Sequence, residues 1–157
     1  WTDQAVNCTM KTSIVSFMAT SDLFVDTSGL YALIDRRDTH HRRARESVER
    51  HVRAGDMLVV TDAIVSETVT LARARSGALV ALRVLDLIEQ SAAIRIERIN
   101  EPRFAATKAY CRKYADQAYS FVDCASFVLM RELRLKSALT SDQHFTQAGF
   151  GALLVAR

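Results

Sequence analysis

The stretch DLFVDTSGL, residues 22–30, joins a short apolar run to a turn. The run LFV has the character of a buried strand, and Asp26 follows it directly. Two later stretches repeat this arrangement, MLVVTD at 57–62 and SALTSD at 137–142. Segments with helical patterns separate the three, and strands that are joined through helices pair in parallel with the helices packed on the sheet. We therefore expect an α/β fold with a central, mostly parallel sheet flanked by helices.

The length and composition of the chain are those of one ordinary globular domain. Its 157 residues can bury a sizeable core, and 49% are hydrophobic while 25% are charged. No apolar stretch approaches the length of a membrane span, so we expect no membrane partner. The net charge of +3 is compatible with a nucleic-acid partner but is too small to indicate one.

Residues 1–20 are polar and weakly patterned, and their apolar part SIVSFMA is too short for a signal-peptide core. We expect an extension that is poorly ordered or partly non-native, with Met18 as an alternative start. A single domain over residues 21–157 is expected to follow. The three cysteines are an odd number without metal-ligand spacing, which favours a reducing cytoplasm over a disulfide framework.

Carboxylates recur where the chain leaves the predicted strands. Asp26 ends the first strand, Asp142 follows SALT, and Glu67 lies one turn into the helix after MLVVT. In a parallel sheet the carboxyl ends of the strands share one edge, where ligands bind. Asp123 lies in SFVDCASFVLM, residues 120–130, where an unpaired charge would cost several kcal/mol if buried. We expect the four acids to converge on one site.

Four clustered carboxylates repel one another and need a counter-charge. Mg²⁺ or Mn²⁺ is the natural one, because hard cations prefer oxygen ligands. Short hydroxyl side chains flank the acids in the sequence and could orient the carboxylates or water bound to a metal; they are Thr27, Ser28, Thr140 and Ser141.

Each acid also has an ordinary interpretation. Asp26 could be a turn or helix-capping residue, and Asp142 could cap the short helix after it. Asp123 could cap a helix that begins near Phe121, and Glu67 could be a solvated helix acid. His144 lies close to Asp142 in the sequence, but we assign it no catalytic role.

The basic run RRDTHHRRAR, residues 36–45, suits an RNA backbone, since phosphate contacts are made mainly by Lys and Arg. Its candidates for backbone contact are Arg42, Arg43 and Arg45. A charged run on a helix is also commonly a solvated face, so both interpretations remain open.

The acidic motifs together resemble the PIN-domain ribonucleases, with the bacterial VapC-type toxins of toxin–antitoxin pairs as the most similar group. The resemblance covers residues 22–155, and the extension before residue 20 is not part of the family pattern. It is carried by a set of motifs in a fixed order: Asp26 with Thr27 and Ser28, then Glu67, Asp123 in YSFVDCASF, Thr140 and Asp142 in LTSDQHF, and QAGF.

The resemblance implies a metal-dependent endoribonuclease in which metal-activated water hydrolyses an RNA phosphodiester bond. Its catalytic acids would be Asp26, Glu67, Asp123 and Asp142. Asp26, Asp123 and Asp142 are the expected metal ligands. Glu67 would either be a further ligand or position the nucleophile. The resemblance also implies a homodimer and a cognate antitoxin protein that blocks the site. Part of the apolar helix ALVALRVLDLI, residues 78–88, would suit a subunit interface.

Two other classes of function are less compatible with the sequence. A non-catalytic RNA- or partner-binding module on the same fold would be recognised by a lost acid, and none is lost. A metal-dependent phosphotransferase of the haloacid-dehalogenase type would use Asp26 as its nucleophile. That pattern needs a second Asp two residues later, where this chain has Ser28.

Overall fold

The computed structural model describes residues 21–156. The predicted extension over residues 1–20, with Met18, therefore lies outside the described residues. The elements follow one another in the order β1 (Leu23–Val25), α1 (Thr27–Ile34), α2 (His41–Ala54), β2 (Leu58–Thr61), α3 (Asp62–Ser76), α4 (Ala78–Gln90), β3 (Ile94–Glu97), α5 (Glu101–Lys113), α6 (Phe121–Glu132), β4 (Ser137–Leu139), α7 (Gln143–Gln147) and β5 (Gly151–Ala152).

The five described strands form one sheet in the order β3-β2-β1-β4-β5, and every pair of neighbours is parallel. Phe24 of β1 pairs with Val59 of β2 on one side and with Ala138 of β4 on the other. The chain moves outward from β1 to β3 and then returns to the opposite side of β1 at β4. This confirms the predicted α/β fold, and it puts the reversal of strand order between β1 and β4, where open parallel sheets bind ligands.

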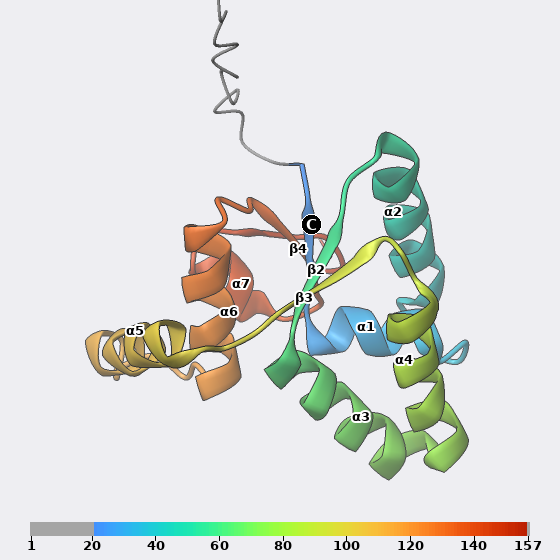
Figure 1. The fold of residues 1–157 in the computed structure, drawn as a ribbon, viewed down its shortest axis with the longest axis horizontal. Coiled ribbons are helices and arrows are strands. Elements are labelled where there is room, and N and C mark those ends of the chain that lie inside the picture. The colour runs from blue at the N-terminus through green and yellow to red at the C-terminus, as the bar shows by residue number, and fades with distance from the viewer. Residues whose placement is uncertain (1–20, 157) are drawn as a thin grey trace, which may run out of the picture.

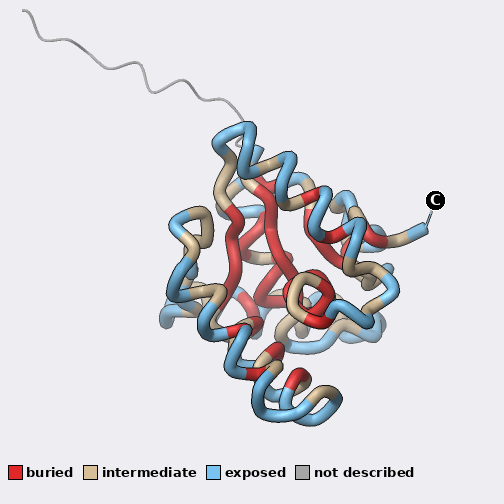
Figure 2. Tube along the Cα trace, turned by 90° about the vertical axis from the view of Figure 1, so that its right-hand side faces the viewer, coloured by how far each residue is buried: buried red, intermediate tan, exposed pale blue. Residues whose placement is uncertain are grey.

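The helices form a layer on each side of the sheet. Figure 1 shows α1 to α4 on one side and α5, α6 and α7 on the other. All residues of β1 and β2 are buried, and Figure 2 shows the buried trace running through the centre of the molecule. The edge strand β3 is only partly buried. No helix within residues 21–156 is long and apolar enough to cross a membrane.

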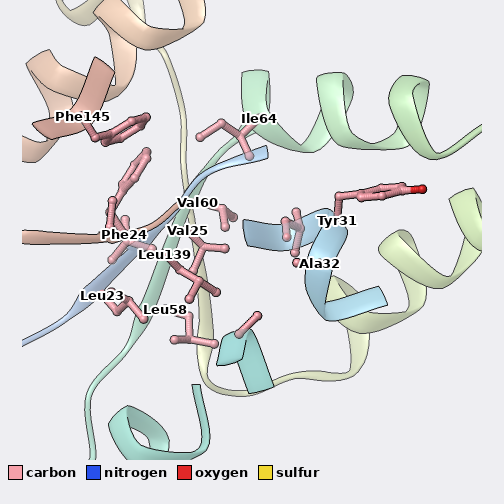
Figure 3. Packing of buried hydrophobic residues seen from close by; sticks show 14 of the residues in the cluster. Leu23, Phe24, Val25, Tyr31, Ala32, Leu58, Val60, Ile64, Leu139 and Phe145 are labelled. Atoms are coloured by element: carbon pink, nitrogen blue, oxygen red, sulfur yellow. The ribbon is translucent and has the colours of Figure 1, made fainter. Parts of the chain in front are cut away.

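Aromatic packing fixes the short helix α7 against the core. Phe145 of α7 is fully buried, and its ring lies 6.1 Å from the ring of Phe24 and 5.0 Å from the ring of Phe127. Figure 3 shows Phe24 and Phe145 facing each other beside the central strands. Because Phe145 is anchored, the neighbouring residues of α7 are held at the carboxyl end of β4.

The segment DTSG is the start of a helix, so the predicted turn after β1 was wrong. Asp26 is the N-cap of α1, and its side chain accepts a hydrogen bond from the backbone N–H of Ser28. A Cβ added to Gly29 would lie 2.0 Å from the carbonyl oxygen of Leu139. Gly29 therefore allows the first turn of α1 to lie directly against the end of β4, which brings Asp26 next to Thr140.

Candidate functional site

A cavity of about 470 Å³ lies where β1 and β4 end, and all four predicted acids line it. We call it the acidic cavity. Its other lining residues include three of the four predicted hydroxyl side chains, Thr27, Ser28 and Ser141. A larger cavity of about 610 Å³ between α2 and α4 contains none of the four acids, so its size does not make it the better candidate.

Asp26 is the most buried of the four acids, with only 6% of its surface exposed. Its Oδ2 accepts hydrogen bonds from the hydroxyl of Thr140 at 2.9 Å and from the hydroxyl of Ser28 at 3.0 Å. Burial raises the pKa of Asp26, and these hydrogen bonds act against the increase without cancelling it. The carboxylate is therefore held in place by neutral donors and remains costly to ionise.

Hydroxyl groups connect the two segments that carry the acids. Thr140, which is fully buried, accepts a hydrogen bond at its Oγ1 from the backbone N–H of Asp142 at 3.0 Å. The Ser28 hydroxyl accepts one from the backbone N–H of Ser141, also at 3.0 Å. The start of α1 and the loop after β4 thus form one hydrogen-bonded unit.

Glu67 reaches the acidic cavity from α3. It is exposed, and its Oε2 accepts a hydrogen bond from the hydroxyl of Thr27. Thr27 is buried at the start of α1, so this bond aims the Glu67 carboxylate toward the segment that carries Asp26.

Asp123 and Asp142 cap helices and also line the cavity. Asp123 forms a capping box with Ser120, whose backbone N–H donates to Asp123 Oδ2 at 2.8 Å. Asp142 is the N-cap of α7. The capping interpretations of Asp123 and Asp142 are therefore confirmed, and both residues also line the acidic cavity. Because Asp26 caps α1, three helix N-termini meet here, and their dipoles offset part of the negative charge.

His144 is a cavity residue to which we assigned no role from the sequence. Its Nδ1 lies 3.5 Å from Asp123 Oδ2 and 3.4 Å from Asp142 Oδ1. Ligand atoms of these three side chains lie within 4.8 Å of one another, a grouping that could hold a metal ion. The available signal was the spacing, since a side chain two residues after a helix-capping Asp lies in the first turn of the same helix.

The predicted RNA-contacting arginines do not line the acidic cavity. Arg42, Arg43 and Arg45 are on α2, where Arg43 donates hydrogen bonds to the carbonyls of Leu153 and Leu154. Arg42 and Arg45 form ion pairs with glutamates one turn further along α2. Among the described residues that line the acidic cavity, Arg75 of α3 is the one Lys or Arg.

The donor set of the acidic cavity fits a divalent cation. It offers carboxylate oxygens, which Mg²⁺ and Mn²⁺ prefer, and a ring nitrogen of His144. No ion pair within residues 21–156 joins Arg75 to any of the four acids. Within the same residues no Lys or Arg side chain is paired with any of these carboxylates, and a cation from outside the chain would relieve their repulsion.

Comparisons with known proteins agree on one family. The sequence model of the PIN domain matches residues 23–151. The chain is 28% identical over 128 residues to the 23S rRNA-specific endonuclease VapC20 of Mycobacterium tuberculosis, in two strains, which covers 82% of this chain and 95% of that protein. The crystal structure of VapC20, described as a sarcin–ricin loop cleaving toxin, superposes with a TM-score of 0.72 at 27% identity, over 82% of this chain and 96% of that chain. The resemblance seen in the sequence is confirmed, and the chain belongs to the PIN domain family.

Proposed function

We propose that the protein is a metal-dependent endoribonuclease and the toxin of a toxin–antitoxin pair. The observation that carries this proposal is the meeting of Asp26, Glu67, Asp123 and Asp142 in one cavity of a PIN-family chain. Four separate segments supply these acids at the point where the strand order reverses. Likeness to the VapC20 endonuclease over most of both chains supports an activity on RNA.

The acids have different proposed roles because their surroundings differ. Asp26, Asp123 and Asp142 would hold Mg²⁺ or Mn²⁺, while Glu67 would be a ligand or would orient the attacking water. A divalent cation bound there lowers the pKa of water and offsets charge on the phosphate. Thr140 and Ser28 hold the Asp26 carboxylate, and Thr27 holds Glu67. These hydroxyls thus keep the oxygen ligands in place before substrate binds.

We propose a structured ribosomal RNA loop as the substrate, since the relative VapC20 is described as specific for 23S rRNA. The test offers the protein a 23S rRNA fragment with the sarcin–ricin loop, and an unstructured RNA, in Mg²⁺, in Mn²⁺ and in EDTA. We expect cleavage of the structured fragment with metal only.

The same assay is repeated with Asp26→Asn and with Glu46→Gln as a matched acid-to-amide control on the exposed face of α2. Cleavage should be lost in Asp26→Asn and kept in Glu46→Gln. Cleavage in EDTA, or by Asp26→Asn, would contradict the proposed mechanism. Binding of RNA without cleavage under all conditions would favour the non-catalytic binding module.

A cognate antitoxin is proposed as the protein partner, and the charge of the acidic cavity indicates how it would bind. A basic side chain placed among the four acids could take over the counter-charge of the metal. Co-expression with the antitoxin should therefore suppress toxicity, and an antitoxin whose basic residues in the toxin-binding segment are replaced should protect less well. Full protection by that variant would contradict this mode of inhibition.

We also propose a homodimer, supported by apolar side chains that α4 leaves exposed. Leu79 is 75% exposed and Leu82 is 54% exposed, which is unusual for neighbouring leucines on one helix. Light scattering should give the mass of a dimer for the natural chain and of a monomer for Leu79→Glu. Arg83→Glu on the same helix is the control for added negative charge. A monomeric natural chain would exclude the homodimer.

A further inference from the structure

His144 differs from His41 and His51 in the hydrogen bonding of its ring nitrogen. Nδ1 of His41 lies 2.7 Å from the carbonyl oxygen of Ala32, and Nδ1 of His51 lies 2.8 Å from that of Ser47. Both rings are therefore satisfied by backbone. Nδ1 of His144 is buried and has no hydrogen-bond partner within the described residues.

The two carboxylates near His144 do not satisfy its ring nitrogen. Their oxygens lie 3.4 Å and 3.5 Å from Nδ1, whereas charge-assisted N–H···O bonds are about 2.7–2.9 Å long. A buried polar atom without a partner costs free energy, so the arrangement calls for a further group. A cation close to all three side chains would take the nitrogen and both carboxylates as ligands.

The position of the ring is fixed by the elements around it. Tyr119 packs against the His144 ring edge-on, with ring centroids 5.4 Å apart. The backbone N–H of His144 donates to Asp142 Oδ1 at 2.8 Å, so this carboxylate is held in a fixed position relative to the residue that carries the ring. The next residue, Phe145, is fully buried in the core. The ring nitrogen is thus held toward the acids before any metal binds.

We propose that His144 supplies a nitrogen ligand to the cation held by Asp123 and Asp142, and that this ligand makes the site prefer Mn²⁺ to Mg²⁺. The inference rests on the proposed function, because it assumes that the acidic cavity binds a divalent cation. Imidazole nitrogen suits first-row transition metals, whereas Mg²⁺ takes oxygen ligands almost exclusively. A site made only of oxygen ligands would lack the nitrogen that favours Mn²⁺ over Mg²⁺.

The direct test is pulsed electron paramagnetic resonance of the Mn²⁺-loaded full chain, prepared without a polyhistidine tag. A coordinated imidazole gives ¹⁴N modulation of the Mn²⁺ spin echo. We expect this modulation in the natural chain and in the control His51→Gln, and we expect its loss in His144→Gln. The measurement on the natural chain needs no variant, so it stands even if His144→Gln folds poorly.

Calorimetric titration with Mn²⁺ and with Mg²⁺ measures the selectivity. His144→Gln should weaken Mn²⁺ binding by roughly 10–100-fold, the loss typical when a supporting partner of a metal site is removed. Its Mg²⁺ affinity should be nearly unchanged, and His51→Gln should match the natural chain with both ions. These affinities are measured without RNA, so they do not depend on activity.

Two results would overturn the inference: Mn²⁺ bound to the natural chain without ¹⁴N modulation, or equal Mn²⁺ affinity in His144→Gln and the natural chain. Asp123→Asn separates this failure from failure of the proposed function. If Asp123→Asn abolishes Mn²⁺ binding and cleavage while His144→Gln changes neither, only the role of His144 is wrong. If the natural chain binds neither ion, the metal site and this inference both fail.

Discussion

Helix α1 carries a buried aspartate at each end, and the two differ in what lies beside them. Asp26 at the start is 6% exposed, and its hydrogen bonds come from the hydroxyls of Ser28 and Thr140. Asp35 at the end is 8% exposed, and both of its oxygens accept hydrogen bonds from the guanidinium of Arg37, each at 3.1 Å. One carboxylate has neutral donors and the other has a cation.

The pKa values of the two carboxyl groups move in opposite directions. Burial raises the pKa of Asp26, whereas the hydrogen bonds from Arg37 hold the pKa of Asp35 well below its usual range. The dipole of α1 would produce the reverse order, since a helix N-terminus favours negative charge and a C-terminus opposes it. Such dipole effects are about 0.3–1 kcal/mol. Burial and the adjacent cation therefore outweigh the dipole at both ends.

This difference separates a structural carboxylate from a candidate ligand. Asp35 is compensated within the chain, so nothing further has to bind. Asp26 shares its cavity with the three other predicted acids and with Asp38, and it has no Lys or Arg ion-pair partner among the described residues. A buried carboxylate of this kind is stable only if it stays protonated or if a cation arrives from outside.

The largest expected effect comes from replacing the two aspartates in turn. Asp26→Asn should reduce RNA cleavage by orders of magnitude, because a proposed metal ligand is lost. In EDTA at neutral pH its free energy of unfolding should rise by roughly 0.5–2 kcal/mol, because relief of a strained active site commonly gives this gain. Asp35→Asn should keep cleavage and melt at a lower temperature, because Arg37 loses its anionic partner.

Thermal melts in EDTA and cleavage assays with Mn²⁺ on the three proteins measure this contrast. Each variant is the control for the other, since both change a buried Asp to Asn at an end of the same helix. A lower melting temperature for Asp26→Asn together with retained cleavage would show that both aspartates are structural.

A second prediction concerns Gly29, which allows α1 to approach β4. In Gly29→Ala the new Cβ would lie 2.0 Å from a backbone carbonyl that cannot move aside cheaply. We expect a loss of roughly 1–3 kcal/mol in the free energy of unfolding, as for other overpacked sites, and a fall in cleavage because Asp26 moves away from Thr140. Urea unfolding and the RNA assay measure the two effects.

Gly151→Ala is the matched control, since the contact there is with the Ser137 hydroxyl at 3.1 Å, which can rotate. Equal stability of Gly29→Ala and the natural chain would mean that Asp26 does not depend on this close approach. The comparison between the two ends of α1 would then rest on charge alone.

The sheet and the meeting of the acids could be predicted from the sequence. Short apolar runs separated by helices imply parallel strands, and parallel strands end at one edge of a sheet. Asp26 and Asp142 each follow such a run, so their proximity required no knowledge of side-chain packing. Gly29 was less accessible, because DTSG has the composition of a turn and the crossing of α1 over β4 is not visible locally.

Features that depend on how helices face one another could not be predicted. The α2 arginines share a basic run, yet they face glutamates and carbonyls away from the acidic cavity. The hydrogen bonds that Arg37 donates to Asp35 are local, but the burial of Asp35 depends on distant parts of the chain. The orientation of the His144 ring depends on Tyr119, which reaches it from a distant segment.

A third prediction uses pH to sharpen the contrast between the two aspartates in EDTA. The folded-state pKa of Asp26 is raised above 3.8, so the folded chain loses stability as pH rises from about 4 through that pKa. The folded-state pKa of Asp35 is lowered, so its stabilisation is complete above about pH 4 and is lost as pH falls through that pKa.

Relative to the natural chain, Asp26→Asn should therefore be more stable at neutral pH and Asp35→Asn less stable. Both differences should shrink as pH falls, the first between the raised pKa of Asp26 and about pH 4, and the second below about pH 4. Urea unfolding of the three proteins between about pH 3 and about pH 7 tests the signs. Differences of the same sign for both variants would remove the distinction drawn between them.

The smallest expected effect concerns Arg37 and Arg75, which, like the two aspartates, differ in whether an oppositely charged partner lies beside them. Arg37 is occupied by Asp35, whereas Arg75 lines the acidic cavity with its guanidinium 5.9 Å from the centre of the Tyr31 ring. Arg75 is exposed and forms no ion pair within residues 21–156. It is therefore available to an RNA phosphate, and Arg75→Ala should weaken RNA binding and lower the slope of log affinity against log salt by about 1.

Arg42→Ala on α2 is the matched variant, since Arg42 is also exposed and is one of the candidates for RNA contact in the basic run. Both changes are made in Asp26→Asn, so that binding is measured without cleavage, over a series of salt concentrations. If only Arg75→Ala changes the slope, an RNA phosphate is bound at the acidic cavity by Arg75, which forms no ion pair with Asp35. If only Arg42→Ala changes the slope, RNA lies on α2, and the basic run indicates the RNA contact better than the acidic cavity does. The pairing of Arg37 with Asp35 then has no bearing on substrate binding.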